Sequence, residues 1–313
     1  MGQGSRSAGV EPVNMARAAD AAVGMGLTRT GGCAGLRRRN AVGIWLRLRS
    51  SAVLSVLVSA LLAAGCARDE GAAGRAFTPA RPGVLTVATA FLPAPGFWGR
   101  PPARAGFEAA LAATLARRLG LRGVAVVQVP FSALVAGHLH GADLALSQLS
   151  PTRARERSLD FTTPYLTAPA GVLVRRGVHG ADLEALRGLG WVIARASTLT
   201  RTVRREVRPR AAPIVVEDRT QALAVLRSGR ADALLLDLPV ALGLAHDDPG
   251  RLAVLAQLPG GEGLAAALPD GSPNREIVDS AIRRLAADGT LGRLATQWLG
   301  EAEEDVPLIR TEG

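Results

Sequence analysis

Short apolar strands and amphipathic helices alternate along the chain after residue 83, and this alternation limits the possible folds more than any other feature. The expected strands are runs rich in β-branched residues and leucine, at 84–87, 124–129, 144–146, 172–174, 191–193, 214–216 and 233–236. The expected helices lie at 107–119, 198–207, 220–226, from Pro239 onward, 275–287 and 291–299. Alternation of this kind predicts an α/β fold with largely parallel sheets. Because it comes in two successive sets, we expect two sheets.

Composition excludes several classes of protein. The 313 residues are 48% hydrophobic and 20% charged, which excludes a disordered chain. Two cysteines are too few for a disulfide framework or a Cys-rich zinc site. The net charge is +10, but six of these ten charges fall in residues 1–65. The remaining chain is only mildly basic, so we expect no nucleic-acid partner.

The N-terminal segment has the pattern of an export signal. Arginines at 37–39, 47 and 49 precede an apolar run at 51–64. Fourteen residues are too few to span a bilayer core of roughly 30 Å, but they suit the apolar region of a signal peptide. Small residues then lead to Cys66, as in a lipobox, where a cysteine receives a lipid.

This pattern predicts the processing and location of the protein. We expect 1–65 to be a signal peptide with an N-terminal extension. We expect 66–82 to be a lipidated cysteine followed by a flexible Ala-, Gly- and Pro-rich tether. The protein would be exported and lipid-anchored to the outer face of the cell membrane, on the periplasmic side where there is an outer membrane. Both the general secretory and the twin-arginine export routes remain open.

Motifs for the common catalytic and cofactor chemistries are missing from the sequence. It contains no Gly-x-Gly-x-x-Gly after a strand, no Walker lysine and no Gly-x-Ser-x-Gly elbow. His138 and His140 are two residues apart, but no further ligands accompany them. We therefore predict no cofactor, no metal site and no catalytic residue.

Five groups of short motifs occur in a fixed order along the chain. They are Gly106–Glu108; Val129–Phe131 with Gly141–Leu144; Ser147–Ser150 with Asp160–Tyr165; Arg230–Ala233 with Asp237–Pro239; and Ala287–Leu291 with Trp298–Leu299. Together they resemble the family 3 extracellular solute-binding proteins, the amino-acid receptors of ABC importers. The resemblance extends from about Gly83 to Gly300.

The resemblance implies a two-lobed, periplasmic-binding-protein-like (type II) α/β fold with two hinge crossings. Lobe 1 would combine residues 83–172 and 268–300, and lobe 2 would be 173–267. The crossings would fall near 172–174 and 264–268, and 301–313 would be an acidic tail.

The resemblance also implies a ligand site for an α-amino acid. The family's carboxylate-binding arginine falls on Arg155, and its amine-binding aspartate falls on Asp237. Its ligand-loop hydroxyl falls on Ser150, and the turn of its second domain supplies Ser197 and Thr198. These residue types suit a zwitterion, because a guanidinium binds a carboxylate through two parallel hydrogen bonds and a carboxylate accepts from an ammonium.

The pocket for the ligand's side chain is less defined in the sequence. The family carries an aromatic residue after the first strand, and Phe91, Phe97 and Trp98 are all candidates here. The identity of the amino acid stays open.

We therefore expect a non-enzymatic, monomeric substrate-binding lipoprotein. Its partners would be an amino acid, an ABC permease with its cytoplasmic ATPase, and the membrane through a lipid anchor. One alternative is an enzyme resembling cyclohexadienyl dehydratase, with Glu108 or Glu262 as the proton donor. Another is a ligand sensor without a transport role.

Overall fold

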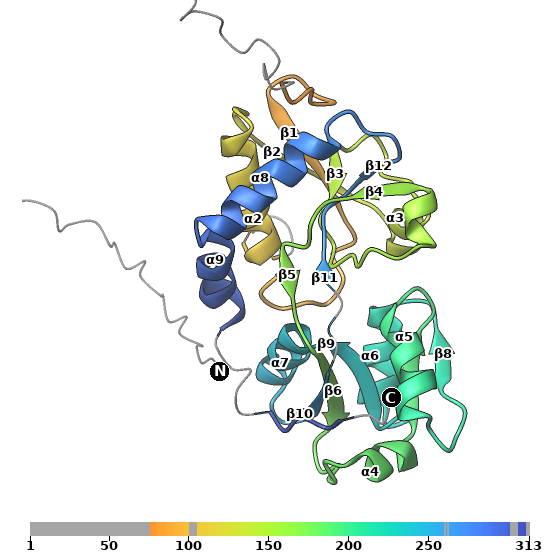
Figure 1. Cartoon of the computed structure of the whole chain (residues 1–313). Coiled ribbons are helices and arrows are strands. Elements are labelled where there is room, and N and C mark those ends of the chain that lie inside the picture. Colours follow the sequence, from red (N-terminus) through yellow and green to blue (C-terminus); the bar gives the residue numbers. More distant parts are fainter. Residues whose placement is uncertain (1–75, 100–104, 260, 262, 301–305, 311–313) are drawn as a thin grey trace, which may run out of the picture. The chain divides into compact units, whose positions relative to one another are not determined.

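The computed structural model describes residues 76–99, 105–259, 261, 263–300 and 306–310 (Figure 1). The expected signal peptide, Cys66, most of the tether and Glu262 lie outside the described residues. Residues 72–313 form one compact unit, which is described here by itself. Within the described ranges, no helix has the length and hydropathy needed to cross a membrane.

The first sheet has five strands and forms the centre of lobe 1 (Figure 1). In spatial order they are β2 (Gly123–Gln128), β1 (Val84–Thr89), β3 (Leu144–Ala145), β12 (Ala267–Pro269) and β4 (Leu159–Phe161). The helices of this lobe are α2 (Phe107–Arg118), α3 (Phe131–Val135), α8 (Arg275–Ala287) and α9 (Thr290–Leu299), with a 3-10 helix at Arg155–Arg157. β1 and β2 are parallel, whereas β12 runs antiparallel to its neighbours β3 and β4.

Alternation of side chains along β1 gives lobe 1 a core on each side of its sheet. Leu85 and Val87 pack in one cluster with Phe107 and Leu111 of α2. Ala88 belongs to a separate cluster on the other side. Successive side chains of a strand point to opposite faces, so helices can cover both sides of the sheet.

The second sheet also has five strands and forms lobe 2. In spatial order they are β10 (Leu252–Leu258), β6 (Ala170–Arg175), β9 (Ala233–Asp237), β7 (Trp191–Ala194) and β8 (Ile214–Val216). The helices of this lobe are α4 (Leu183–Gly188), α5 (Leu199–Thr202) continued by a π-helix at Val203–Val207, α6 (Arg219–Arg227) and α7 (Leu238–Asp247). Strands β7, β8 and β9 are parallel, while β6 is antiparallel to β9 and β10. The prediction of largely parallel sheets is therefore wrong, because each sheet is mixed.

Two short strands connect the lobes. β5 (Leu166–Thr167) pairs antiparallel with β11 (Gly263–Leu264) in a sheet of their own. The expected first crossing at 172–174 instead lies within β6, in the second sheet. Its apolar side chains are fully buried between helices, which is the environment of a central strand. The strand order thus assigns the first crossing to β5, and the second to β11 and the residues that follow it.

Part of the expected tail packs on lobe 2. Ile309 is buried in the core cluster of that lobe. Its backbone N–H donates to the carbonyl of Gln257 in β10, and the Gln257 N–H donates to the carbonyl of Pro307. Residues 306–310 therefore extend the edge of the second sheet, although the expectation was a simple acidic tail at 301–313.

Candidate functional site

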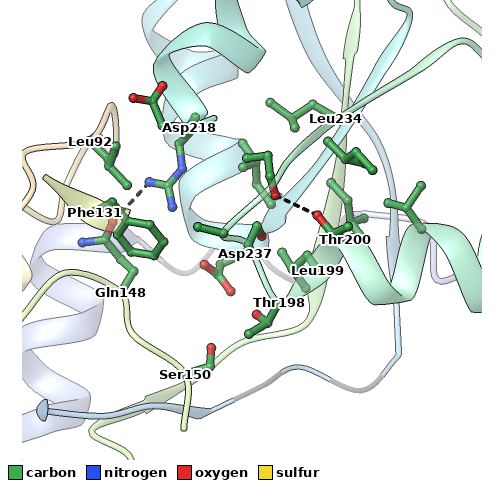
Figure 2. Close-up of a pocket in the computed structure, with 18 of the residues that line it drawn as sticks. Leu92, Phe131, Gln148, Ser150, Thr198, Leu199, Thr200, Asp218, Leu234 and Asp237 are labelled. Carbon is green, nitrogen blue, oxygen red and sulfur yellow. Dashed lines mark hydrogen bonds between the residues drawn. The ribbon is translucent and has the colours of Figure 1, made fainter. Parts of the chain in front are cut away.

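One pocket is lined by residues of both lobes and contains every residue expected to bind the amino-acid backbone. These residues are Ser150 and Arg155 from lobe 1, and Ser197, Thr198 and Asp237 from lobe 2. Figure 2 shows Ser150 and Thr198 facing each other on one side of Asp237. Residues as far as 87 positions apart in the chain thus meet at a single cavity.

Arg155 is held in place by backbone carbonyls of both lobes. It opens the 3-10 helix Arg155–Arg157 and is 8% exposed. One Nη atom donates to the carbonyl of Ser150 at 2.7 Å, and the other donates to the carbonyl of Ala196 at 2.9 Å. The guanidinium carbon lies 5.9 Å from the centre of the Phe131 ring. These contacts fix the plane of the guanidinium, which favours planar recognition of a carboxylate.

Asp237 lies where β9 ends and α7 begins. Leu238 and Pro239 open the helix, and proline is favoured there because that position needs no hydrogen bond from its own backbone nitrogen. The Asp237 side chain makes no capping bond to α7 and is 9% exposed. Its carboxylate therefore lies at the pocket and does not act as the helix cap.

The hydroxyl residues come from the segments that face Asp237. Ser150 is buried in the segment after β3. Thr198 occupies the position before α5, and its side chain makes no capping bond to that helix. Ser197 precedes it and also lines the pocket.

The three aromatic candidates are not among the residues that line this pocket. Phe97 is fully buried and packs edge-on against Phe107 in the lobe 1 core. Trp98 donates its indole N–H to the carbonyl of Leu146, and Phe91 packs edge-on against Trp98. The apolar side chains at this part of the pocket are Leu92 and Phe131.

Gln148 and Arg219 also line the pocket, and the sequence reasoning did not identify them as site residues. An Nη atom of Arg219 donates to the side-chain oxygen of Gln148 at 3.1 Å and to the carbonyl of Pro93 at 3.3 Å. Gln148 has a positive φ of 48°, which is uncommon for a residue other than glycine and is often found at functional sites. Gln148 belongs to the motif Ser147–Ser150, which was the available signal for it in the sequence, whereas nothing in the sequence distinguishes Arg219 from other arginines.

Glu108 lies behind the pocket and orients Gln148. It is fully buried, and its carboxylate accepts hydrogen bonds from the backbone and side-chain N–H groups of Gln148 and from the hydroxyl of Tyr165. Burial raises the pKa of Glu108, although these hydrogen bonds and the charge of Arg219 act in the opposite direction. Burial and the nearby Glu108 charge also raise the pKa of Tyr165.

The groups that line the site can recognise an amino-acid backbone. Across the described residues, no group of three or more His, Cys, Asp or Glu side chains is arranged to hold a metal ion. The pocket offers a fixed guanidinium, a carboxylate and several hydroxyls, which together match the two charged groups of an amino-acid backbone.

Known proteins resemble this chain in both sequence and structure. The L-cystine-binding protein TcyJ of Escherichia coli (strain K12) is 28% identical over 198 residues, which cover 62% of this chain and 74% of that protein. Membrane-bound lytic murein transglycosylase F of Ectopseudomonas mendocina (strain ymp) is 28% identical over 280 residues, which cover 82% of this chain and 54% of that protein. Among solved structures, an ancestral arginine-binding protein bound to glutamine is 26% identical with a TM-score of 0.61, and the match covers 71% of this chain and 100% of that one.

The family match agrees with the fold and with the position of the pocket. The model of the bacterial extracellular solute-binding proteins, family 3, matches residues 90–301, a range that includes both sheets in large part and every residue that lines the pocket. The chain therefore belongs to the bacterial extracellular solute-binding proteins of family 3.

Proposed function

We propose that this protein is the substrate-binding component of an ABC importer and that it binds an α-amino acid between its two lobes. The observation that carries the proposal is the convergence of Arg155 and Asp237 on one pocket. The guanidinium would bind the α-carboxylate, and the Asp237 carboxylate would accept from the α-ammonium. Ser150, Ser197 and Thr198 would supply further hydrogen bonds.

Binding would be coupled to closure of the lobes. The hydrogen bond from Arg155 to Ala196 and the one from Arg219 to Gln148 both join lobe 1 to lobe 2. The space enclosed by the pocket is about 50 Å³, enough for only a few water molecules at about 10–15 Å³ each. Ligand entry would require the lobes to separate, and a permease would recognise the closed form.

The remaining parts of this proposal concern the location of the protein. Export through the N-terminal signal and lipidation of Cys66 would hold a monomer at the outer face of the membrane, next to its permease. The basic flank, the apolar run and the small residues before Cys66 support this. Labelling with a radioactive or clickable fatty acid in cells tests it, since Cys66→Ser should abolish incorporation.

We propose a binding role and not an enzymatic one. Glu108, the described candidate for a proton donor, does not line the pocket, and its carboxylate accepts three hydrogen bonds from Gln148 and Tyr165. Those contacts favour a structural role for this carboxylate.

Isothermal titration calorimetry of residues 72–313 against the amino acids tests the proposed function. At least one amino acid should bind with micromolar affinity or better. Asp237→Asn should weaken that binding strongly, because the amide carries no charge to match the ammonium. Asp247→Asn, at the exposed end of the same helix, is the matched control. Absence of binding by every amino acid, or equal affinities for the Asp237 variant and the control, would refute the proposal.

A further inference from the structure

Arg219 brings a second cation to the pocket, beside Gln148 and not beside the Ser150 carbonyl that holds Arg155. Arg155 contacts the carbonyl of Ser150, whereas Arg219 contacts the side chain of Gln148. Figure 2 shows Gln148 on one side of Asp237 and Ser150 on another. An amino acid held by Arg155 and Asp237 would therefore extend its side chain toward Gln148 and Arg219.

The guanidinium of Arg219 retains donors for a ligand. One Nη atom makes both of its hydrogen bonds, to Gln148 and Pro93. In the part of the chain that the structure describes, the Nε and the other Nη atom of Arg219 make no hydrogen bond. The residue is half-buried at the start of α6, so its orientation is constrained by the helix.

Arg219 also stays charged in this environment. Burial lowers its pKa, and the carboxylates of Asp237, Glu108 and Asp218 offset only part of this effect. A guanidinium keeps its proton under ordinary conditions because its pKa starts so high. A ligand side chain would therefore meet a cation with N–H groups directed to an acceptor.

Gln148 sets the polarity of this end of the pocket. Its amide nitrogen donates to the buried carboxylate of Glu108, so its oxygen is the atom that faces Arg219. Arg219 and Glu108 compensate each other's charge through this amide, just as Arg155 and Asp237 match the two charges of the ligand backbone. A cationic ligand side chain would place a second positive charge beside Arg219. The two other carboxylates in this part of the lining are already engaged, because Glu217 pairs with Arg195 and Asp218 caps α6. Two adjacent cations are unfavourable in a partly buried site.

We propose that Arg219 determines side-chain specificity, selecting amino acids whose side chain ends in a carboxamide or carboxylate oxygen and rejecting cationic ones. This inference rests on the proposed function, because it takes Arg155 and Asp237 as the backbone-binding groups. Carboxamides and carboxylates share the acceptor oxygen that Arg219 requires. They differ in charge, so the experiment can distinguish them.

Calorimetry of the purified full chain in mild detergent, with glutamine, asparagine, glutamate, aspartate, arginine and lysine as ligands, tests the proposal. The tightest of the amide and acidic ligands should bind at least about tenfold more tightly than arginine or lysine, since a charge-assisted hydrogen bond changes affinity by about ten- to hundredfold. Comparing the affinities for glutamine and asparagine with those for glutamate and aspartate then shows whether a carboxamide or a carboxylate is preferred. Tighter binding of arginine or lysine would overturn the proposal.

Variants at the same position provide the second measurement. Arg219→Gln should reduce the preference over cationic ligands at least about tenfold, because it removes the charge. Arg219→Lys should keep the rejection of cations but weaken amide and acid binding, because it keeps the charge and loses the planar donors. Arg227→Gln, at the exposed end of the same helix, should change neither ratio. An unchanged ratio in Arg219→Gln overturns the specificity role alone, whereas no binding of any amino acid to the unmodified chain removes the proposed function as well.

Discussion

Replacement of Arg155 is the most direct test of how the pocket binds a ligand. The two Nη atoms are held by carbonyls from opposite lobes, so the guanidinium plane is fixed when the lobes are closed. Two charge-assisted hydrogen bonds to a carboxylate contribute about 1.5–3 kcal/mol each. Arg155→Ala should therefore weaken binding of the preferred amino acid by about 3–6 kcal/mol, which is about 10²- to 10⁴-fold in Kd.

The comparison with lysine separates the charge of Arg155 from its geometry. Arg155→Lys keeps a cation but cannot form two parallel bonds, so its Kd should fall between those of the wild type and Arg155→Ala. Calorimetry with the preferred amino acid gives the Kd values, and thermal unfolding without ligand checks that each variant folds. Arg157→Ala is the control, because Arg157 is exposed on the same 3-10 helix. A folded Arg155→Ala with a Kd within about threefold of wild type would refute the reasoning, and so would an Arg155→Lys that binds as tightly as wild type.

Three further predictions concern stability. Burial raises the pKa of Glu108 above its ordinary value of 4.5, so the contribution of Glu108 to stability is fully present below pH 4.5 and is lost as pH rises through the raised pKa. Urea unfolding across pH should show this decline in the wild type but not in Glu108→Gln. Identical pH profiles of the two proteins would contradict the prediction. Ile309→Ala should lower the free energy of unfolding by about 2–5 kcal/mol if the tail is docked, and a change below about 0.5 kcal/mol in denaturant titration would show that it is not. Gly106→Ala should lower the free energy of unfolding by about 1–3 kcal/mol or more, because φ is 119° and a Cβ would lie 2.4 Å from the carbonyl oxygen of Phe97. Gly120→Ala, where a Cβ meets no atom within 4 Å, should lower it less in the same titration. Equal losses of stability would exclude the contact with Phe97 as the cause.

Strong local periodicity made the long elements predictable. The expected helix at 275–287 matches α8, and the helix expected at 291–299 differs from α9 by one residue. Short elements escaped prediction because one or two turns show no clear period. α3 and α4 are examples, with five and six residues.

The sequence by itself determined the class of fold and predicted the residues for the ligand backbone. Ordered motifs identified Arg155 and Asp237, and these residues do line one pocket. The N-terminal pattern determined the expectation of export, which lies outside the described residues.

Only the tertiary structure decided how strands pair, where the lobes are joined and what forms the rest of the pocket. Several features depend on partners far away in the chain. They are the antiparallel pairing of β12 with β4 and of β6 with β9, the crossing at β5 and the docking of Ile309. Arg219 looks in the sequence like one of many surface arginines, because its significance comes from Gln148, 71 residues earlier. The residues proposed to bind the ligand backbone lie in or beside motifs that can be read in the sequence, whereas Gln148 and Arg219, proposed to contact the ligand side chain, are brought together only by folding.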